Sequence, residues 1–409
     1  MYTIIMNKNA LEGLKVLDLT QAMAGPFASM LLGDLGAEII KIEPLKGDQT
    51  RKWVPPYLNG MSSYFLSTNR NKKSIGIDLK SEEGKNIFMK LCETADIIME
   101  NFRPGTMEKL GLSYENIKKT RPDIIYCSIS GFGSTGPLKD LPGYDLTVLA
   151  YSGLLSLNSE NDRAPIKFGV PIADITSGLF SDIAILSALV ERKNSGKGQY
   201  IDMSMLDSNF LELTHQAFYY FGTNNNPEHL GSAHQSIAPY QVYKSFDGYI
   251  AIAAGSEKLW NDLLKAINRE DLKLDDRFID NKERVNHRNE LEKELNFSLS
   301  LFYTEDLIKK LNEYGIPCAP INSINEAVGN SQLKYREMVT KIKGKYGEIP
   351  MLGTPFKMSE TPGEIKYAPP ELGENTDEIL KSIGFSHEDI NNLKEKMVIN
   401  NGVKTDDQL

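Results

Sequence analysis

Two aspartates stand where an apolar stretch changes character, and a carboxylate at such a place can act as a nucleophile. Asp145 lies in PGYDLTVLAYSG, and Asp174 lies in FGVPIADITSGLF. Asp174 ends a strand-like run and opens a long helical pattern, so its simplest role is that of a helix N-cap. The amides at a helix start would also keep a carboxylate ionised for attack on a carbonyl carbon. The pattern leaves both roles open.

A glycine-rich segment, GFGSTG at residues 131–136, follows the strand-like run DIIYCSIS. A strand that runs into G-x-G-x-x-G is typical of a dinucleotide-binding turn, which requires a helix directly after the glycines. Here Pro137 follows at once, and a second Pro-Gly pair at 142–143 interrupts any long helix. The pattern also lacks a second strand ending in the acidic residue that binds ribose. These features favour a glycine turn at the carboxyl edge of a sheet, where open α/β sheets bind ligands.

The histidines and cysteines do not indicate a metal centre. The five histidines lack the spacing of metal ligands, and the three cysteines lie far apart, without a zinc or disulfide pattern. The sequence therefore predicts no metal and no permanently bound cofactor. Scarce cysteines fit a reducing compartment, so we expect a cytoplasmic protein.

The charge distribution argues against some partners. The chain has 46 basic and 55 acidic residues and a net charge of −9, spread along its length. This disfavours nucleic acid and an anionic membrane as partners, but it is compatible with a local basic pocket for phosphates. The first residues lack the pattern of a signal peptide, and we expect no apolar run long enough to span a bilayer.

The elements that must position the aspartates follow an alternating pattern. Short β-rich runs separated by helix-length segments predict an α/β fold with a parallel sheet flanked by helices. The predicted strands cover residues 14–19, 37–43, 73–79, 95–101, 123–130 and 196–206. The predicted helices between and after them begin at Gly25-Pro26 and cover residues 82–94, 107–120, 174–192 and 207–222.

The pattern changes after the polar segment 223–236. The stretch PYQVYKSFDGYIAIAA predicts a β-hairpin, and helices are expected at 256–267, 288–302 and 304–314. The Pro- and Gly-rich segment 347–376 is expected to be an extended connection before a last helix at 374–397. We therefore expect a large domain at 1–203 that is completed by 374–409, a linker at 204–225, a small α+β domain at 226–325 and a return linker at 326–373.

Several long motifs in order resemble the class III CoA-transferase family, also called the CaiB/BaiF family. They include LEGLKVLDLTQAMAGPFASMLLGDLGAEIIKIEPLKGDQTR, ADIIMENFRPGTMEKLGL, GFGSTGP, PGYDLTVLAYSGLLS and PIADITSGLFSDIAILSALVERKNSGKGQYIDMSMLD. The match runs from about residue 11 to at least residue 255. The resemblance implies a Rossmann-like large domain, a smaller α+β domain and a homodimer of two interlocked, ring-shaped subunits.

The resemblance also implies roles for individual residues. An aspartate at the position of Asp174 attacks the acyl-CoA thioester in this family, so coenzyme A is a substrate and neither ATP nor a metal is needed. Lys109 stands where the formyl-CoA enzyme has an arginine, which keeps the charge but loses the bidentate fork. The residues that match CoA-contacting positions are Met23, Ala24, Ile77, Asp78, Leu79, Lys80, Asn101, Phe102, Arg103, Lys109, Pro142, Gly143, Tyr144 and Asp145.

Two alternative functions must be weighed against CoA transfer. The same family contains α-methylacyl-CoA racemases, whose acid/base pair includes a histidine in a GHD triplet. This chain has GYD, with Tyr144 at that position, and an ordinary tyrosine pKa of about 10 makes a poor base at neutral pH. This favours transferase over racemase. A non-catalytic CoA-binding protein, in which Asp174 only caps its helix, is the other alternative.

Overall fold

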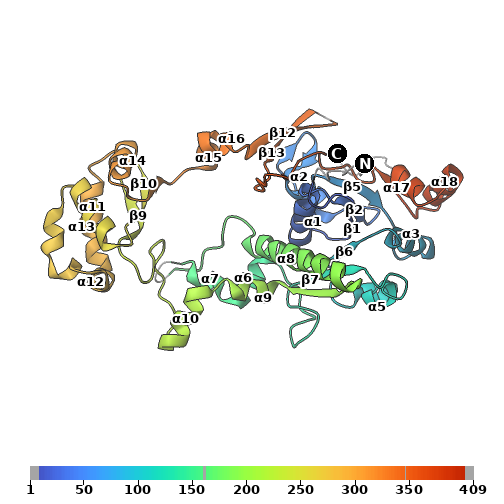
Figure 1. Cartoon of the computed structure of the whole chain (residues 1–409), viewed down its shortest axis with the longest axis horizontal. Helices are drawn as coiled ribbons and strands as arrows, with labels where there is room; N and C mark the ends of the chain where they lie inside the picture. The colour runs from blue at the N-terminus through green and yellow to red at the C-terminus, as the bar shows by residue number, and fades with distance from the viewer. Residues whose placement is uncertain (1–8, 160–162, 346, 401–409) are drawn as a thin grey trace, which may run out of the picture. The chain divides into compact units, whose positions relative to one another are not determined.

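The computed structural model describes residues 9–159, 163–345 and 347–400. The ends at 1–8 and 401–409, which the sequence assigns to the large domain, lie outside the described residues. The described chain divides into two units (Figure 1). The first contains the chain up to Leu154, Phe168–Leu213 and the chain from Gln332 onward, and the second contains Leu155–Lys167 and Thr214–Ser331.

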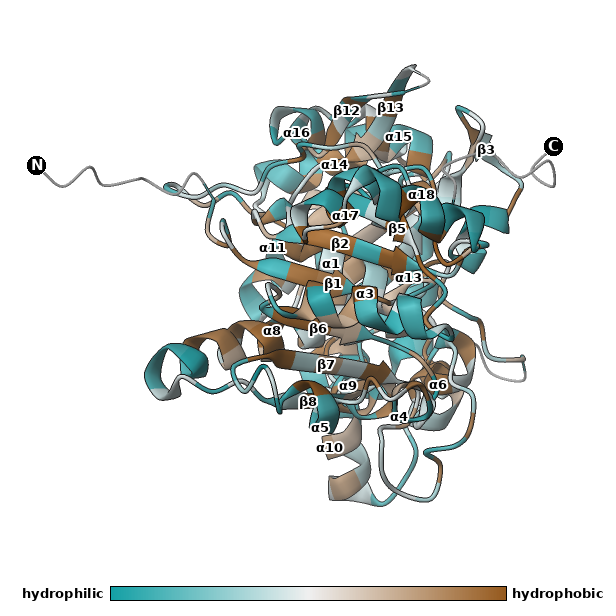
Figure 2. Ribbon diagram, turned by 90° about the vertical axis from the view of Figure 1, so that its right-hand side faces the viewer, coloured by the Kyte–Doolittle hydropathy of each residue, from teal (hydrophilic) through white to brown (hydrophobic). Residues whose placement is uncertain are grey.

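A six-stranded sheet organises the first unit, and each of its neighbouring strand pairs is parallel. Its strand order is β5-β2-β1-β6-β7-β8. The strands are β1 (Lys15–Asp18), β2 (Glu38–Glu43), β5 (Lys72–Gly76), β6 (Ile97–Glu100), β7 (Ile125–Ser130) and β8 (Tyr200–Ser204). The predicted parallel sheet flanked by helices is confirmed. The central strands are largely apolar because helices cover both of their faces (Figure 2).

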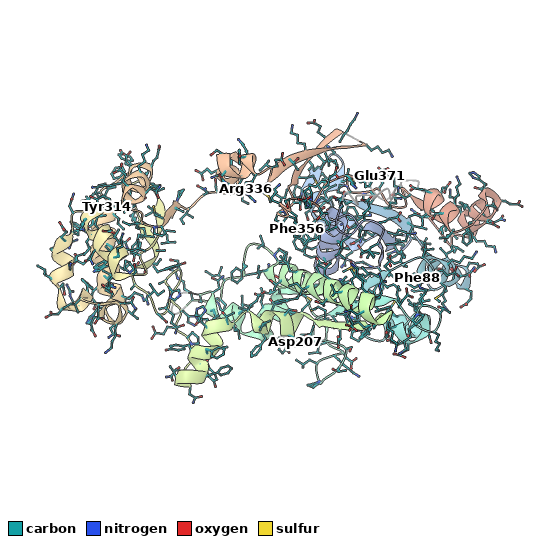
Figure 3. The ribbon with its side chains drawn as sticks, in the orientation of Figure 1. Phe88, Asp207, Tyr314, Arg336, Phe356 and Glu371 are labelled. Atoms are coloured by element: carbon teal, nitrogen blue, oxygen red, sulfur yellow. The ribbon has the colours of Figure 1, made fainter. Side chains whose placement is uncertain are left out.

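Helices cover each face of this sheet with apolar side chains. On one face, α3 (Glu82–Cys92), α17 (Thr376–Ser382) and α18 (His387–Glu395) share a core with strand residues. Phe88 of α3, labelled in Figure 3, is fully buried in that core. The helix α3 begins where its N-cap residue Ser81 accepts a hydrogen bond from the amide of Gly84.

The other face carries α1 (Ala24–Asp34) and α8 (Ile172–Ser195), which pack along each other. A Cβ on Gly178 would lie 2.8 Å from the carbonyl oxygen of Ala24, so the two helices approach at backbone distance there. Among the described residues, only α8 has the length and apolar composition of a membrane-spanning helix. The expectation that no segment reaches that length is therefore corrected. The helix packs on α1, β7 and β8, as a core helix of an α/β protein does.

Four predicted elements differ from the structure. The predicted helix at 107–120 is two short helices, α4 (Thr106–Leu110) and α5 (Tyr114–Ile117), because Gly111 has a left-handed φ of 77°. The predicted helix at 207–222 is α9 (Met205–Leu211) and α10 (Thr214–Thr223), with a break at residues 212–213 just before Thr214, whose φ is 40°. Gly384 separates α17 from α18 in the same way. The predicted connection 347–376 begins with a strand, β13 (Gly347–Leu352), which pairs with β12 (Val339–Gly344).

The second unit has its own sheet and core. The predicted hairpin is confirmed as β9 (Tyr240–Lys244) and β10 (Tyr249–Ala253), and β11 (Cys318–Pro320) joins it in an antiparallel sheet. Helices α11 (Glu257–Ala266), α12 (Asn281–Asn286), α13 (Arg288–Leu299) and α14 (Thr304–Glu313) follow the hairpin. The buried side chain of Trp260 and the buried leucines of these helices form one apolar core.

Candidate active site at the carboxyl edge of the parallel sheet

The chain reverses its direction across the sheet between β1 and β6. Counted along the chain within the sheet, the strand order is 3-2-1-4-5-6, so the first strand lies beside the fourth. Open α/β sheets bind ligands outside the carboxyl ends of the strands at such a point. The loop after β1 leads to Met23 and Ala24, and the loop after β6 begins with Asn101. Two of the predicted CoA-contacting segments therefore flank the expected ligand position.

These two loops are joined by a side-chain amide. Asn101 Oδ1 accepts a hydrogen bond of 2.8 Å from the backbone amide of Gln21, and Asn101 Nδ2 donates one of 2.8 Å to the Gln21 carbonyl. The amide group thus replaces the strand pairing that ends at β1 and β6. It joins the loop that leads to Met23 to the loop that continues with Phe102 and Arg103.

The remaining predicted CoA contacts follow other strands on the same edge. Ile77 and the next three residues follow β5, where the Asp78 amide donates to the Val398 carbonyl at 2.8 Å. Three exposed cations, Lys80, Arg103 and Lys109, make no ion pair within the described residues. Because they have no carboxylate partners, they are available to the phosphates of a nucleotide.

The backbone of the GFGSTG segment packs directly against the backbone at Gly143. A Cβ on Gly131 would lie 2.5 Å from the Cα of Gly143, and one on Gly143 would lie 2.3 Å from the Cα of Gly131. None of the described residues 131–144 is helical, which supports the interpretation as a turn rather than a dinucleotide-binding motif. Asp202 at β8 holds the turn by accepting hydrogen bonds from the amide and hydroxyl of Ser134.

Asp145 provides the cap of the helix that carries Asp174. The buried Oδ1 of Asp145, at the first residue of α6 (Asp145–Ser152), accepts a hydrogen bond of 2.9 Å from the amide of Ala173. The N-cap residue of α8 is Pro171, whose side chain makes no cap bond, and Asp174 lies in the first turn. The interpretation of Asp174 as an N-cap is therefore wrong, because a carboxylate from a distant segment already satisfies that helix end.

The first turn of α8 holds Asp174 at the switch-point edge. Asp174 is partly exposed, and the amides at the helix start stabilise a negative charge there. Buried Asn209 of α9 donates to the carbonyl of Met205 at 2.8 Å and to that of Ala173 at 3.3 Å, which ties α8 to α9. One turn further along, Gly178 contacts the backbone of Ala24. Asp174 thus lies one helical turn from a predicted CoA-contacting residue.

Tyr64 lies within the electrostatic field of this carboxylate, and Trp53 packs against Tyr64. Tyr64 is a half-buried residue of α2 (Ser63–Thr68), and the ring of Trp53 meets it edge-on with 4.8 Å between centroids. Burial, followed by the negative charges of Asp174 and Asp145, raises the pKa of Tyr64 to about 12. Its hydroxyl therefore stays a hydrogen-bond donor near both carboxylates. No local motif marks Tyr64, since only the packing of α2 brings it there.

The site chemistry is that of carboxylates, a phenol and exposed cations. No group of three or more His, Cys, Asp or Glu side chains within the described ranges is arranged to hold a metal ion. Such a site can bind a phosphate-bearing thioester at the sheet edge and present a carboxylate to its carbonyl carbon.

Known proteins resemble the chain over most of its length. Residues 11–376 match the model of the family described as CoA-transferase family III. The mouse protein named succinyl-CoA:glutarate CoA-transferase is 40% identical over 380 residues, which cover 91% of this chain and 86% of that protein. The Agrobacterium fabrum protein named succinate--glutarate CoA-transferase is 37% identical over 384 residues, which cover 92% of this chain and 96% of that protein.

A solved structure shows the same fold. The crystal structure of a CAIB/BAIF family protein from Brucella suis matches with a TM-score of 0.84 at 38% identity, and the match covers 92% of this chain and 100% of that one.

Proposed function

This chain belongs to CoA-transferase family III and is a class III CoA-transferase, and we propose that it moves coenzyme A between succinyl-CoA and a second dicarboxylate, with Asp174 as the nucleophile. The relatives named for succinate and glutarate support the choice of acids. One observation carries the role of Asp174. This carboxylate lies in the first turn of α8, whose next turn contacts Ala24 at the switch point of the sheet.

The proposed reaction exchanges one thioester for another through Asp174. Its carboxylate oxygen attacks the thioester carbonyl, the C–S bond breaks, and an acyl-aspartyl anhydride and CoA thiolate form. The thiolate then attacks the aspartyl carbonyl, which releases the donor acid and leaves an aspartyl-CoA thioester. The acceptor carboxylate attacks that thioester and expels the thiolate, and the thiolate takes the acceptor acyl group and frees Asp174. Each step replaces one acyl bond by another, so covalent catalysis divides one difficult exchange into easier ones.

The residues around Asp174 supply binding and charge stabilisation in this proposal. Lys80, Arg103 and Lys109 are the proposed partners of the CoA phosphates, and Met23 and Ala24 line the path of the thioester arm. The hydroxyl of Tyr64 is placed to donate to an oxygen that gains negative charge near Asp174. Asp145 holds the start of α8 and so fixes the direction from which Asp174 attacks.

A homodimer is part of the proposal. Leu179, Ile183 and Val190 form an exposed apolar stripe on α8, and Phe210 and Leu211 of α9 are exposed as well. A second copy of the chain would cover such a surface, in keeping with the interlocked dimer that the family resemblance implies. Light scattering of the purified protein should give a mass of two chains across a range of concentrations. A monomer at micromolar concentration would contradict this part of the proposal.

The function is tested by an exchange assay with defined acids. Purified protein is incubated with succinyl-CoA and isotope-labelled glutarate, and the thioesters are separated and identified by mass spectrometry. We expect labelled glutaryl-CoA and an equal amount of free succinate. Acetate and butyrate serve as monocarboxylate acceptors in parallel. Equal or faster transfer to these acids would overturn the assignment of a dicarboxylate substrate.

A further inference from the structure

Charged side chains are buried on the face of the sheet that α1 covers. They alternate along neighbouring strands, so their side chains share one face, and Asp18 pairs in register with Lys41. Asp18 lies on β1, Lys41 and Glu43 lie on β2, and Lys72 lies on β5. Taking such charges out of water costs several kcal/mol for each ion unless it is well paired. The arrangement therefore needs a reason other than the stability of the sheet.

Lys41 connects two loops at the catalytic edge. Its ammonium lies 2.9 Å from Asp48 Oδ2 and donates a hydrogen bond of 2.8 Å to the Thr20 carbonyl. Burial lowers the pKa of Lys41, but the negative charges that surround it outweigh burial, so the net pKa is raised. The side chains of Lys41 and Asp48 are both fully buried. A single buried cation thus ties the loop after β1 to the turn after β2.

On one side of this tie, Thr20 is held at each of its polar atoms. Asp18 Oδ1 accepts from the Thr20 amide at 2.9 Å and from its hydroxyl at 2.5 Å, while Lys41 holds the carbonyl. A Cβ on Gly25 would lie 2.3 Å from the Thr20 side chain, so Thr20 also packs against the start of α1. Between them, Ala22 has a φ of 67°, a strained value for alanine that a rigid surrounding must maintain.

On the other side, Asp48 organises the turn that leads to Trp53. Asp48 Oδ1 accepts from the amide of Thr50 at 2.9 Å and from its hydroxyl at 2.8 Å. Arg51 in the same turn pairs with Glu43 at 2.7 Å, and its guanidinium lies 3.7 Å over the ring of Phe65. Phe65 follows Tyr64 in α2, so this turn supports the helix that holds Tyr64 within the electrostatic field of Asp174.

We propose that Lys41 is a positioning residue of the active site. Its ammonium fixes the separation between the Thr20–Ala24 loop and the turn at residues 48–53. Lys41 has no exposed surface and touches no substrate, so it acts only through these two loops. The inference rests on the proposed function, in which Met23 and Ala24 of the first loop line the path of the thioester arm and the Tyr64 hydroxyl donates to an oxygen near Asp174. A misplacement of about 1 Å between such groups costs about 100-fold in rate.

The test compares two matched double variants. Lys41→Met with Asp48→Asn removes the buried pair but keeps a side-chain oxygen at position 48 as the acceptor for Thr50. Arg70→Met with Asp34→Asn removes another buried pair, 2.6 Å apart, at the opposite end of α1 and away from the catalytic edge. Neutral replacement of both partners of a buried ion pair is often tolerated by the fold. Both variants are measured for thermal unfolding, CoA affinity by calorimetry, and kcat and KM for CoA transfer.

We expect the Lys41/Asp48 variant to lose about 100-fold in kcat and about 10-fold in CoA affinity, and the Arg70/Asp34 variant to stay within about twofold of the wild type in both. Unchanged kcat and CoA affinity in a folded Lys41/Asp48 variant, or equal losses in both variants, would overturn the inference. Absence of transfer by the wild type would contradict the proposed function instead, and the CoA affinities would still decide the role of Lys41. If the double variant does not fold, Asp48→Asn alone should show the same losses at a smaller size, and unchanged values there would also overturn the inference.

Discussion

The carboxylate of Asp145 accepts a hydrogen bond of 2.9 Å from the backbone amide of Ala173, the residue directly before Asp174. The two partners are 28 positions apart in the chain. An acid at the start of one helix therefore fixes the start of the helix that carries the proposed nucleophile. The sequence leaves open whether Asp174 caps its helix or acts as a nucleophile. In the structure Asp145 caps the helix, and the proposed chemistry belongs to Asp174.

Replacing Asp145 should affect both stability and activity. Asp145→Ala removes the oxygen that satisfies the Ala173 amide, so we expect a loss of about 1 kcal/mol in the free energy of unfolding. CoA transfer should fall as well, because the first turn of α8 loses its anchor. Asp145→Asn keeps an acceptor oxygen and should retain more of both. Urea unfolding and the exchange assay measure these effects, with exposed Asp140→Ala as the control. Identical unfolding midpoints for Asp145→Ala and the wild type would refute the capping role.

Replacing Asp174 should abolish CoA transfer without unfolding the protein. The Asp174→Asn side chain cannot form the anhydride, so we expect kcat to fall by about 1,000-fold or more. Glu191→Gln, an exposed acid near the end of the same helix, is the matched control. Hydroxylamine with succinyl-CoA should inactivate the wild type by capturing the aspartyl intermediate, and mass spectrometry should locate the modification at Asp174. Activity above a tenth of the wild type in Asp174→Asn would exclude it as the nucleophile.

Gly143 should not tolerate a side chain. An alanine Cβ there would lie 2.3 Å from the Cα of Gly131, so two backbone segments beside the site would have to separate. We expect Gly143→Ala to lower the free energy of unfolding by about 1 to 3 kcal/mol and to lower CoA affinity. Gly329→Ala, where no atom lies within 4 Å of the added carbon, is the control. Equal free energies of unfolding for the two variants would show that the Gly131 and Gly143 backbones can move apart without cost.

Glu100 should make stability depend on pH. It ends β6 beside the predicted CoA loop, and its Oε2 accepts a hydrogen bond of 2.8 Å from the Phe102 amide. Burial raises the pKa of Glu100 to about 7, although hydrogen bonds from Ser128 and Phe102 partly offset that effect. The folded protein therefore binds more protons than the unfolded chain between pH 4.5 and about 7. Glu100 therefore contributes its full stability to the fold below pH 4.5. This stability is lost as the pH rises through about 7.

Glu100→Gln should remove this dependence. The variant keeps an oxygen for the Phe102 amide and carries no charge, so at pH 8 we expect it to exceed the wild type by about 1 to 3 kcal/mol in the free energy of unfolding. Urea unfolding between pH 5 and pH 8 checks the prediction, with exposed Glu191→Gln as the control. A parallel pH dependence in the wild type and in Glu100→Gln would show that Glu100 is not the responsible group.

The wild type should not exchange α-protons. Tyr144 stands where the racemase motif has a histidine, and its side chain is exposed at the start of α6. In deuterated water with a 2-methylacyl-CoA, we expect no deuterium at the α-carbon during many rounds of CoA transfer. Mass spectrometry of the recovered thioester measures this. Incorporation at a rate comparable to transfer would establish racemisation as an activity of this chain.

The sequence by itself determined the order and type of the main elements and the segments that carry the chemistry. Alternating apolar runs are local signals, and they indicated the parallel sheet, the hairpin and the helix that bears Asp174. The long ordered motifs were specific enough to indicate the family. The helices that break at Gly111, before Thr214 and at Gly384 are shorter than their apolar patterns indicate, because a single residue with a left-handed φ interrupts a helix without interrupting its apolar pattern.

Only the tertiary structure decided how these residues work together. It assigned the cap of α8 to Asp145, brought Tyr64 into the field of Asp174, placed Gly131 against Gly143 and enclosed Lys41 between two loops. Each of these relationships joins segments that are separate in the chain. They depend on strand order and on the packing of α1, α2 and α8. Local sequence preferences do not encode these contacts between distant segments. The same short sequences and glycines also occur in loops that pack against no other segment.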